Sequence, residues 1–597
     1  MPLTTGQGTA FIRARCLRPP CPSDCGHTRA RGGIAGLGVD FTASGLAAGG
    51  EQGAHSMQRR NFLAGAAAAA TLPVSGTGAQ AQAAGVVDAR KLLTTTAALD
   101  PARPEAARLF AKTCKELGWD VEVVIQPYAQ AIQGVINDHT HDMFLTGWAG
   151  TVSRIDPDTY IYLRYHSSQA KKGGYNFSQS NDPAMDRIAD AQRREMDLEK
   201  RRALVYEAQR LIEQRQAEIT LAYMSANNAH RSDRLGNVVP MMGEGIGGFW
   251  TDIEMTVLKG DGYARNGGTG DVPHLNPIAA RDITEFAELA SIYDRLFQID
   301  RTGRVVPWAA TGYSFASPTT MDITLRDGMK FHDGMPVTAG DAKFSIDYHK
   351  AQKSPYFSSA LQIVDSVEIT GKLAIRINFT EPSASFMSNV LAYMFLIPAH
   401  IWKDYPGKAG VDDVIKFPNE APIGSGPFRF VHWRRGSELK VDAVKDHHHA
   451  PKCAGMIRSV YGSHDAMAAA IEKDECDRTR YLLSIAHIEA LSKVKGVIAK
   501  PYPSHGFYSL ALNTQKPPFD KQIFRQALHK ALPTDFFIDV ILKGSVEPAG
   551  SVISPVNAFW HDSSVKPVTP DVKAARKMLG DAGYKWDSAG RLLYPTA

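Results

Sequence analysis

The sequence predicts an α/β protein, because strand-like and helix-like segments alternate along most of the chain. Residues 91–96 are rich in β-formers, residues 105–117 carry a helical apolar stripe, and residues 120–126 are again dense in Val and Ile. Gly118 ends the helical stretch. Alternation of this kind is typical of helices packed on a sheet.

Length and composition place the chain among globular proteins. It has 597 residues, of which 44% are hydrophobic and 22% charged. The net charge is +5, from 67 basic and 62 acidic residues, and no basic stripe follows a strand or helix. A nucleic-acid partner is therefore excluded from the expected functions.

Residues 57–83 (MQRRNFLAGAAAAATLPVSGTGAQAQA) have the pattern of an export signal. Arg59 and Arg60 precede a short apolar run and a small-residue cleavage region, as in signals of the twin-arginine route. Because such signals work from a free N-terminus, we interpret residues 1–56 as a mis-called or disordered extension. The mature protein is expected in the periplasm.

Later segments continue the alternation. Residues 182–195 and 197–214 are predicted helices, followed by an apolar run at 219–223. Residues 259–271 (KGDGYARNGGTGD) are Gly-rich and polar, which predicts a linker. Thr338 is the expected N-cap of a helix.

The final helix is expected to have Thr569 as its N-cap and to stop at Gly583. Three cysteines follow the signal. Cys114 falls on an apolar helical stripe, and a disulfide between Cys453 and Cys476 is left open.

Seven segments together resemble the extracytoplasmic solute-binding proteins of peptide, nickel and related ABC importers, solute-binding family 5. They are DVPHLNP with IYDRLF, ITLRDGMKFHDGMPVTAGDAKFS, FLIPAHIW, PIGSGPFRF, LALNTQKPPFDKQIFRQALHKAL, AARKMLGDAGY, and GWAG followed by DPD. The resemblance implies a two-lobe α/β fold, the periplasmic binding protein type II fold, whose lobes close on a ligand at a hinged cleft. It also implies a monomer that binds a small molecule or peptide, reaches the membrane only through an ABC permease and ATPase complex, and needs no cofactor.

The order of these segments departs from the family. DVPHLNP normally follows the signal, whereas here it comes after the segments that usually close the chain. The sequence therefore looks circularly permuted, with residues 86–228 and 505–597 forming one lobe and 229–504 the other. The linker at 259–271 would join the old ends. The hinge is expected near 504–508 and 226–229.

The sequence contains no recognisable catalytic constellation, so an enzyme is not expected. The expected binding wall is the loop after the apolar strand that ends at Gly147 and Trp148, because α/β sheets place ligands at strand ends. The family commonly has an acid three positions after the Trp, where this chain has Thr151. Arg154 lies in the same loop and is a candidate donor to an anionic group.

In the other lobe, Glu285 and Phe286 match a ligand-facing position of the family. Glu285 is expected either to supply the missing charge or to cap its helix. The run His447–His449 matches no metal-ligand spacing, so no metal site is assigned. The leading hypothesis is a periplasmic receptor for an oligopeptide, dipeptide or related small solute. The alternatives are a metal or metal-chelate carrier of the same fold, and an enzyme exported by the twin-arginine route.

Overall fold

The computed structural model describes residues 85–97, 99–407, 413–480 and 483–596. All of them belong to one compact unit, Ala79–Ala597. The extension at 1–56 and the export signal at 57–83 lie outside the described residues. None of the described helices is long and apolar enough to span a bilayer.

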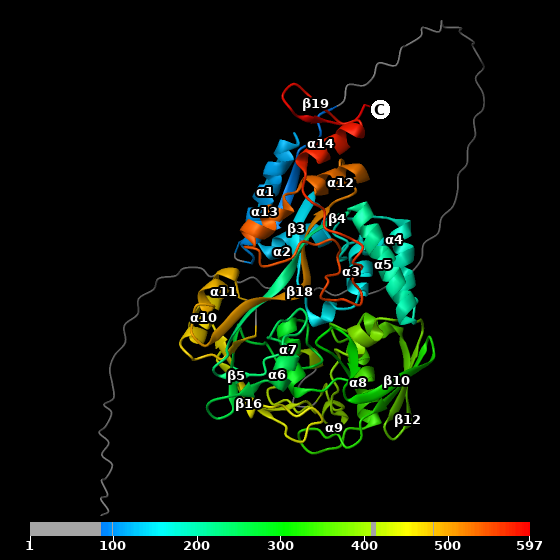
Figure 1. Cartoon of the computed structure of the whole chain (residues 1–597). Helices are drawn as coiled ribbons and strands as arrows, with labels where there is room; N and C mark the ends of the chain where they lie inside the picture. The colour runs from blue at the N-terminus through cyan, green and yellow to red at the C-terminus, as the bar shows by residue number, and fades with distance from the viewer. Residues whose placement is uncertain (1–84, 98, 408–412, 481–482, 597) are drawn as a thin grey trace, which may run out of the picture. The chain divides into compact units, whose positions relative to one another are not determined.

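A mixed ten-stranded sheet forms the centre of the described unit (Figure 1). Its strands, in spatial order, are β14 (Phe428–Arg434), β15 (Glu438–Ala443), β16 (Gly455–Tyr461), β7 (Tyr263–Thr269), β17 (Arg478–Thr479), β4 (Glu218–Arg231), β18 (Val497–Leu512), β3 (Met143–Trp148), β1 (Arg90–Thr95) and β2 (Val121–Gln126). β1 runs parallel to β2 and β3, and β7 runs parallel to β16 and β17. The predicted α/β class is confirmed.

Smaller sheets and helices complete the unit. A four-stranded sheet holds β10 (Ala310–Ser317), β11 (Thr320–Leu325), β13 (Ala374–Phe379) and β12 (Val364–Gly371). Three two-stranded pairs are β5 (Leu235–Gly236) with β6 (Thr256–Val257), β8 (Phe297–Ile299) with β9 (Val305–Pro307), and β19 (Lys585–Trp586) with β20 (Leu592–Leu593). The helices are α1 (Ala102–Glu116), α2 (Tyr128–Ile132), α3 (Asp158–Tyr165), α4 (Pro183–Arg194), α5 (Leu198–Arg215), α6 (Phe249–Glu254), α7 (Ile283–Ile292), α8 (Ala339–Ala351), α9 (Ala399–Trp402), α10 (His464–Glu472), α11 (Ile485–Leu491), α12 (Gln522–Ala531), α13 (Thr534–Phe536) and α14 (Val572–Asp581).

The two largest clusters of buried apolar side chains form separate cores. One core joins residues 87–145 and 219–222 to residues 508–592. The other is built from residues 235–456, together with Val152 and Ile155 of the loop after β3. Segments far apart in the chain therefore share one core, as the proposed lobe of 86–228 and 505–597 requires. The lobe boundaries themselves stay a prediction.

The long strands β4 and β18 connect these two parts of the unit (Figure 1). They pair antiparallel from Glu218 opposite Ala511 to Arg231 opposite Val497. Their register shifts between Pro503 and Phe507, so Ser504–Gly506 form a bulge within the ladder. The expected hinge at 504–508 falls on this interruption.

The linker predicted at 259–271 is wrong, because Tyr263–Thr269 form strand β7 inside the large sheet. Gly267 of this strand allows neighbouring side chains to pack closely against the backbone. A Cβ on Gly267 would lie 2.8 Å from Cys476 Sγ and 3.0 Å from Met467 Cγ of α10. Only the exposed residues 258–261 before β7 have the character of a connector.

The C-terminal hairpin β19–β20 is joined to the chain just before β1. Val86 forms an antiparallel bridge with Leu593, and the amide of Tyr594 donates to the carbonyl of Gly85 at 2.9 Å. A circular permutation requires these two places to be neighbours. The permuted order nevertheless stays a prediction.

A re-cut protein is expected to test that order. It would join residue 595 to residue 86 through a short Gly-Ser linker and open the chain between residues 259 and 262. Because both changes fall at exposed or adjacent positions, we expect it to fold with a cooperative melting transition close to that of the parent. Circular dichroism during heating is the measurement, and loss of cooperative melting would count against the prediction.

Candidate functional site

The loop that follows β3 brings Trp148 and Arg154 together. The Arg154 guanidinium lies 4.0 Å from the centroid of the Trp148 ring, and Arg164 of α3 lies 4.8 Å from it. Trp148 is only 5% exposed and belongs to a hydrophobic cluster with α3, α4 and α5. The Trp148 side chain therefore belongs to the core and also makes a cation–π contact with Arg154. Its truncation is expected to lower the stability of the fold.

Arg154 is a cation without an acidic partner among the described residues. It lies in a 3-10 turn, Val152–Arg154, and donates from Nη1 to the carbonyl of Ala149 at 3.1 Å. Burial lowers its pKa, so the protonated guanidinium is poorly solvated where it stands. A guanidinium in this state is suited to receive an anionic group.

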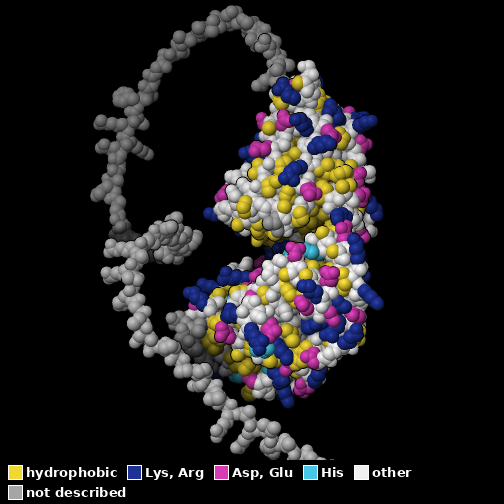
Figure 2. Space-filling model, turned by 90° about the vertical axis from the view of Figure 1, so that its left-hand side faces the viewer, with side chains coloured by type: hydrophobic (Ala, Val, Ile, Leu, Met, Phe, Trp, Pro, Cys, Tyr) yellow, Lys and Arg dark blue, Asp and Glu magenta, His cyan; other side chains and the backbone are white. Residues whose placement is uncertain are grey.

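The same loop faces an aromatic wall of the other core. Phe286 packs against Tyr393 and Tyr356, with ring centroids 4.7 and 4.8 Å apart. Val152, Phe286, Tyr393, Arg295 and Glu244 line one cavity of about 30 Å³. That volume holds a water or two and no solute. We refer to this region, between the loop after β3 and the residues of α7, as the closed cleft. Figure 2 shows the surface indented at the height where β4 and β18 run in Figure 1.

Arg295 is a cation that lines this cavity. It is 5% exposed, and its Nε has no hydrogen-bond partner. Nη1 makes only long bonds of 3.3 Å, to Gln298 Oε1 and to the carbonyl of Ala392. Desolvation lowers its pKa. No described carboxylate lies within ion-pairing distance of it.

Glu244 supplies the negative charge of the cavity. Burial raises its pKa to about 7, although Arg480, Arg295 and the backbone N–H of Val152 favour the ionised form. The carboxylate is thus poised between its two protonation states near neutral pH. A cationic group of a ligand would stabilise the ionised one.

The other predicted residues have local roles in this closed cleft. Glu285 completes the capping box of α7, accepting from the amides of Arg281 and Asp282 at 2.5 and 3.2 Å. Thr151 contacts Ser153, with 2.9 Å between their hydroxyl oxygens. Gly147 allows β3 to pack closely, since a Cβ there would lie 2.8 Å from Arg103 Nη2. Of the predicted residues, Phe286 lines this cavity, Arg154 interacts electrostatically with Tyr356 of the aromatic wall, and Trp148 lies in the core beneath Arg154.

Comparisons with known proteins show which family the sequence resembles. Residues 304–596 match the family described as bacterial extracellular solute-binding proteins, family 5 Middle. This part of the chain belongs to that family. This membership confirms the resemblance drawn from the motifs, and with it the α/β, type II periplasmic binding protein fold.

Two curated family 5 proteins illustrate the likeness. A glutathione-binding protein of Pectobacterium atrosepticum is 26% identical over 318 residues, which are 52% of this chain and 59% of that protein. An oligopeptide-binding protein of Bacillus subtilis is 27% identical over 274 residues, 44% of this chain and 48% of that one. The chain thus spans about half the length of these relatives.

Solved structures of similar proteins include NikZ of Campylobacter jejuni in complex with Ni(L-His). It has a TM-score of 0.43 and 18% identity, covering 56% of this chain and 66% of that one. CtaP of Listeria monocytogenes has a TM-score of 0.45 and 24% identity, covering 55% and 66%.

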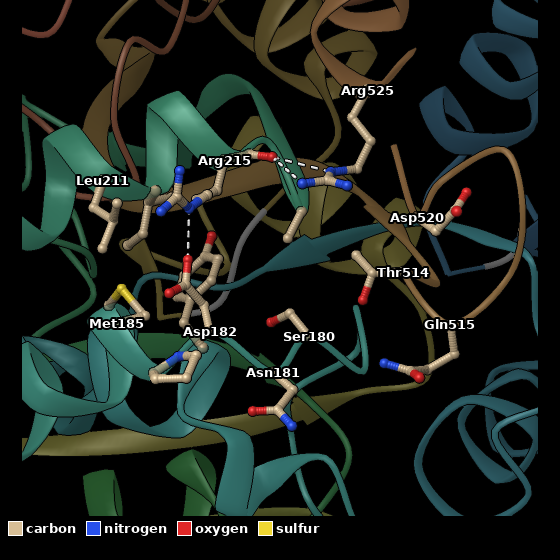
Figure 3. A pocket seen from close by; sticks show the side chains of 14 residues that line it. Ser180, Asn181, Asp182, Met185, Leu211, Arg215, Thr514, Gln515, Asp520 and Arg525 are labelled. Atoms are coloured by element: carbon tan, nitrogen blue, oxygen red, sulfur yellow. Dashed lines mark hydrogen bonds and ion pairs between the residues drawn. The ribbon is translucent and has the colours of Figure 1, made fainter. Parts of the chain in front are cut away.

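A larger cavity lies away from the cleft of this family 5 protein (Figure 3). It has a volume of about 290 Å³, and its charged groups already have partners. Arg215 Nε donates to Asp182 Oδ2 at 2.6 Å, and Arg525 donates to the carbonyl of Arg215 at 3.0 and 2.7 Å. Arg525 thereby caps the C-terminal end of α5. We interpret this cavity as structural.

Glu244→Gln is expected to flatten the dependence of stability on pH. The pKa of Glu244 is raised from 4.5 to about 7 in the folded protein. Its protonated form therefore stabilises the fold fully below its unfolded pKa, and this contribution is lost as the pH rises through about 7. Melting temperatures of the ligand-free protein between about pH 5 and 8 measure the effect. Glu420→Gln, at an exposed ion pair with Arg435, is the control, and equal curves for both variants would contradict the assignment.

Proposed function

We propose that this family 5 protein is a periplasmic receptor that captures a small solute and delivers it to an ABC import permease with its ATPase. The solute is an oligopeptide, a dipeptide or a related small molecule. Membership of the family supports the proposal, as do the glutathione- and oligopeptide-binding activities in the names of two relatives. Export by the twin-arginine route, a monomeric state, and contact with the membrane only through the permease complete it.

The observation that carries the proposal is a pair of cations, Arg154 and Arg295, that both interact electrostatically with Tyr356 of the aromatic wall. Arg154 and Arg295 come from opposite walls, and neither has a carboxylate partner among the described residues. A buried charge without a partner is costly, so such a charge is retained where a ligand neutralises it. We infer that the solute carries at least one carboxylate.

Glu244 supports a second feature of the solute. Thr151 stands where relatives commonly have an acid, so an α-ammonium group is not met at that position. Glu244 lines the same cavity as Arg295, and its raised pKa of about 7 reflects an incompletely compensated charge. A peptide-like zwitterion, with its carboxylate toward the arginines and its ammonium toward Glu244, satisfies both sets of groups.

Mass spectrometry of the natively purified protein is the direct test. A bound species that carries both a carboxylate and an amine is the expected result. Thermal shift assays then follow with glutathione, with dipeptides and with their amidated forms, because a ligand that binds the folded state raises the melting temperature. A neutral sugar as the bound species, or equal shifts with acid and amide, would overturn the proposed solute class.

Arg154→Gln is expected to weaken binding of the solute by about 1.5–3 kcal/mol, the usual effect of losing a hydrogen bond to a charged group. Isothermal titration calorimetry with the co-purifying solute measures it. The matched control is Arg304→Gln, because Arg304 is an exposed arginine paired with Asp300 at 3.2 Å. Equal affinities of the two variants would remove Arg154 from the binding site.

A metal or metal-chelate carrier is the alternative within the same fold. Elemental analysis of the same native preparation distinguishes it from the leading proposal. An enzyme exported by the twin-arginine route would instead turn over its ligand, which the mass spectra would reveal.

A further inference from the structure

A group of possible metal ligands lies in the large core, apart from the cleft residues Arg154 and Glu244. It consists of Asp294, which follows α7, and of His447 and His448 in the connection between β15 and β16. Among the described residues, this is the one group of three or more such side chains whose ligand atoms all lie within 4.8 Å of one another. Segments about 150 residues apart in the chain, 153 for Asp294 and His447, meet here.

The atoms have the spacing of a coordination site. Nε2 of His447 is 3.1 Å from Asp294 Oδ1, and Nε2 of His448 is 3.9 Å from the same oxygen. Ligand atoms about 2.0–2.2 Å from a tetrahedral zinc ion are about 3.3–3.6 Å from one another. Small side-chain rotations therefore bring the three atoms onto one ion.

Two of these groups lack partners despite their burial. The side chain of Asp294 is fully buried and that of His448 is 10% exposed, yet Asp294 Oδ2 and His448 Nε2 have no hydrogen-bond partner. Unsatisfied buried polar atoms are rare in folded proteins, and several that converge on one place call for a missing ligand. Asp294 Oδ2 has a lone pair for a metal ion, and His448 Nε2 has one when the ring carries its proton on Nδ1.

The surroundings hold the ligands in place. Trp308 donates from Nε1 to Asp294 Oδ1 at 2.7 Å, which orients the carboxylate. Nδ1 of His448 lies 2.9 Å from Nδ1 of His449, so that His448 can donate there while Nε2 binds an ion. Outer contacts of this kind fix the ring and its tautomer in metal sites.

An entry path to the site is also present. His332, His447 and His448 line a cavity of about 470 Å³. Arg326, Lys330 and Arg429 line the same cavity, so a fourth coordination position facing it is suited to water or to an anionic co-ligand.

We propose that Asp294, His447 and His448 bind a divalent first-row transition metal ion, of which zinc is the simplest representative. Two imidazoles and one carboxylate are a donor set that suits zinc, nickel and copper. The ion ties the end of α7 to the connection before β16. The proposal does not rest on the transport function, because the cleft contributes none of its ligands.

Loading the site has one local cost. Nδ1 of His447 accepts a bond of 3.0 Å from the amide of His449. Since a neutral imidazole that binds through Nε2 carries its proton on Nδ1, that bond must be released when the ion enters. His448 needs no such change.

The test is calorimetric titration of the chelator-treated mature protein with zinc chloride. One zinc ion per chain is the expected result, together with a melting temperature that rises with zinc concentration. Asp294→Asn and His448→Gln are expected to weaken binding by at least about tenfold. His487→Gln is the matched control, because His487 is a surface histidine that pairs with Asp465 at 2.7 Å, and it should bind zinc like the parent.

Asp294→Asn also separates this site from chance binding by the histidine run, which that variant leaves intact. Unchanged zinc affinity in Asp294→Asn would show that the run alone holds the ion, and the proposal would fail. The melting curve of the metal-free variant shows whether it folds. Should it not fold, His448→Gln decides the question on the same criterion.

Discussion

Arg164→Met is expected to lower the free energy of unfolding by about 3–5 kcal/mol, because it leaves the Glu218 carboxylate buried without its cation. The side chains of Arg164 and Glu218 form an ion pair and are both fully buried. Arg164 also lies 3.9 Å above the Phe177 ring and 4.8 Å from that of Trp148. The pair therefore connects α3 to the start of β4 beneath the loop that carries Arg154.

Urea denaturation followed by tryptophan fluorescence measures this change. The double variant Arg164→Met with Glu218→Leu should recover much of the loss, since a buried ion pair can be replaced by apolar groups at little cost. Arg210→Met is the control, because Arg210 is 53% exposed in its pair with Asp562 and should contribute less than about 1 kcal/mol. Similar losses in Arg164→Met and Arg210→Met would show that breaking the Arg164–Glu218 pair costs no more than breaking an exposed pair.

Gly506→Ala is expected to reduce solute affinity by about tenfold or more and to destabilise the protein by about 1–3 kcal/mol. A Cβ at this position would lie 2.4 Å from the nitrogen of Gly150 and 2.6 Å from the carbonyl oxygen of Trp148. Both atoms are backbone, so no side chain can move aside. The loop after β3 has to shift, and Arg154 shifts with it.

Gly312→Ala is the matched control for this substitution. Gly312 lies in β10, and nothing is within 4 Å of a Cβ built there. Calorimetry with the co-purifying solute and thermal melting give the two readouts. If Gly506→Ala binds the solute like Gly312→Ala, the loop does not depend on its contact with β18.

Local signals in the sequence were sufficient for much of the secondary structure. Thr338 begins α8 through a capping box with Asp341, as its position before an apolar helical pattern predicts. Gly583 follows α14 with φ of +89°, a conformation that favours glycine. The start of that helix was misplaced by two residues, because Asp571 accepts from the Ala574 amide and is the N-cap in place of Thr569. Neighbouring residues with similar capping ability cannot be ranked by sequence alone.

Tertiary contacts decided where these expectations failed. Tyr263–Thr269 look like a linker because glycine and polar residues dominate them, yet the pairing with β16 and β17 makes them a strand. Glu285 satisfies the start of its own helix, a role that the sequence analysis had left open beside ligand binding. Glu244 and Arg295 were missed, since neither belongs to a binding motif. Arg295 lies beside Asp294 in the family segment IYDRLF, and nothing in that segment marks its side chain as ligand-facing.

The paired strands β4 and β18 determine how the two cores can move. Their ladder extends on both sides of the bulge at Ser504–Gly506, so a bend in one strand is passed directly to the other. We expect this two-stranded ribbon to act as a hinge, so that the two cores move mainly by one rotation relative to each other. The two cores would therefore keep a common axis of rotation whether they stand apart or together.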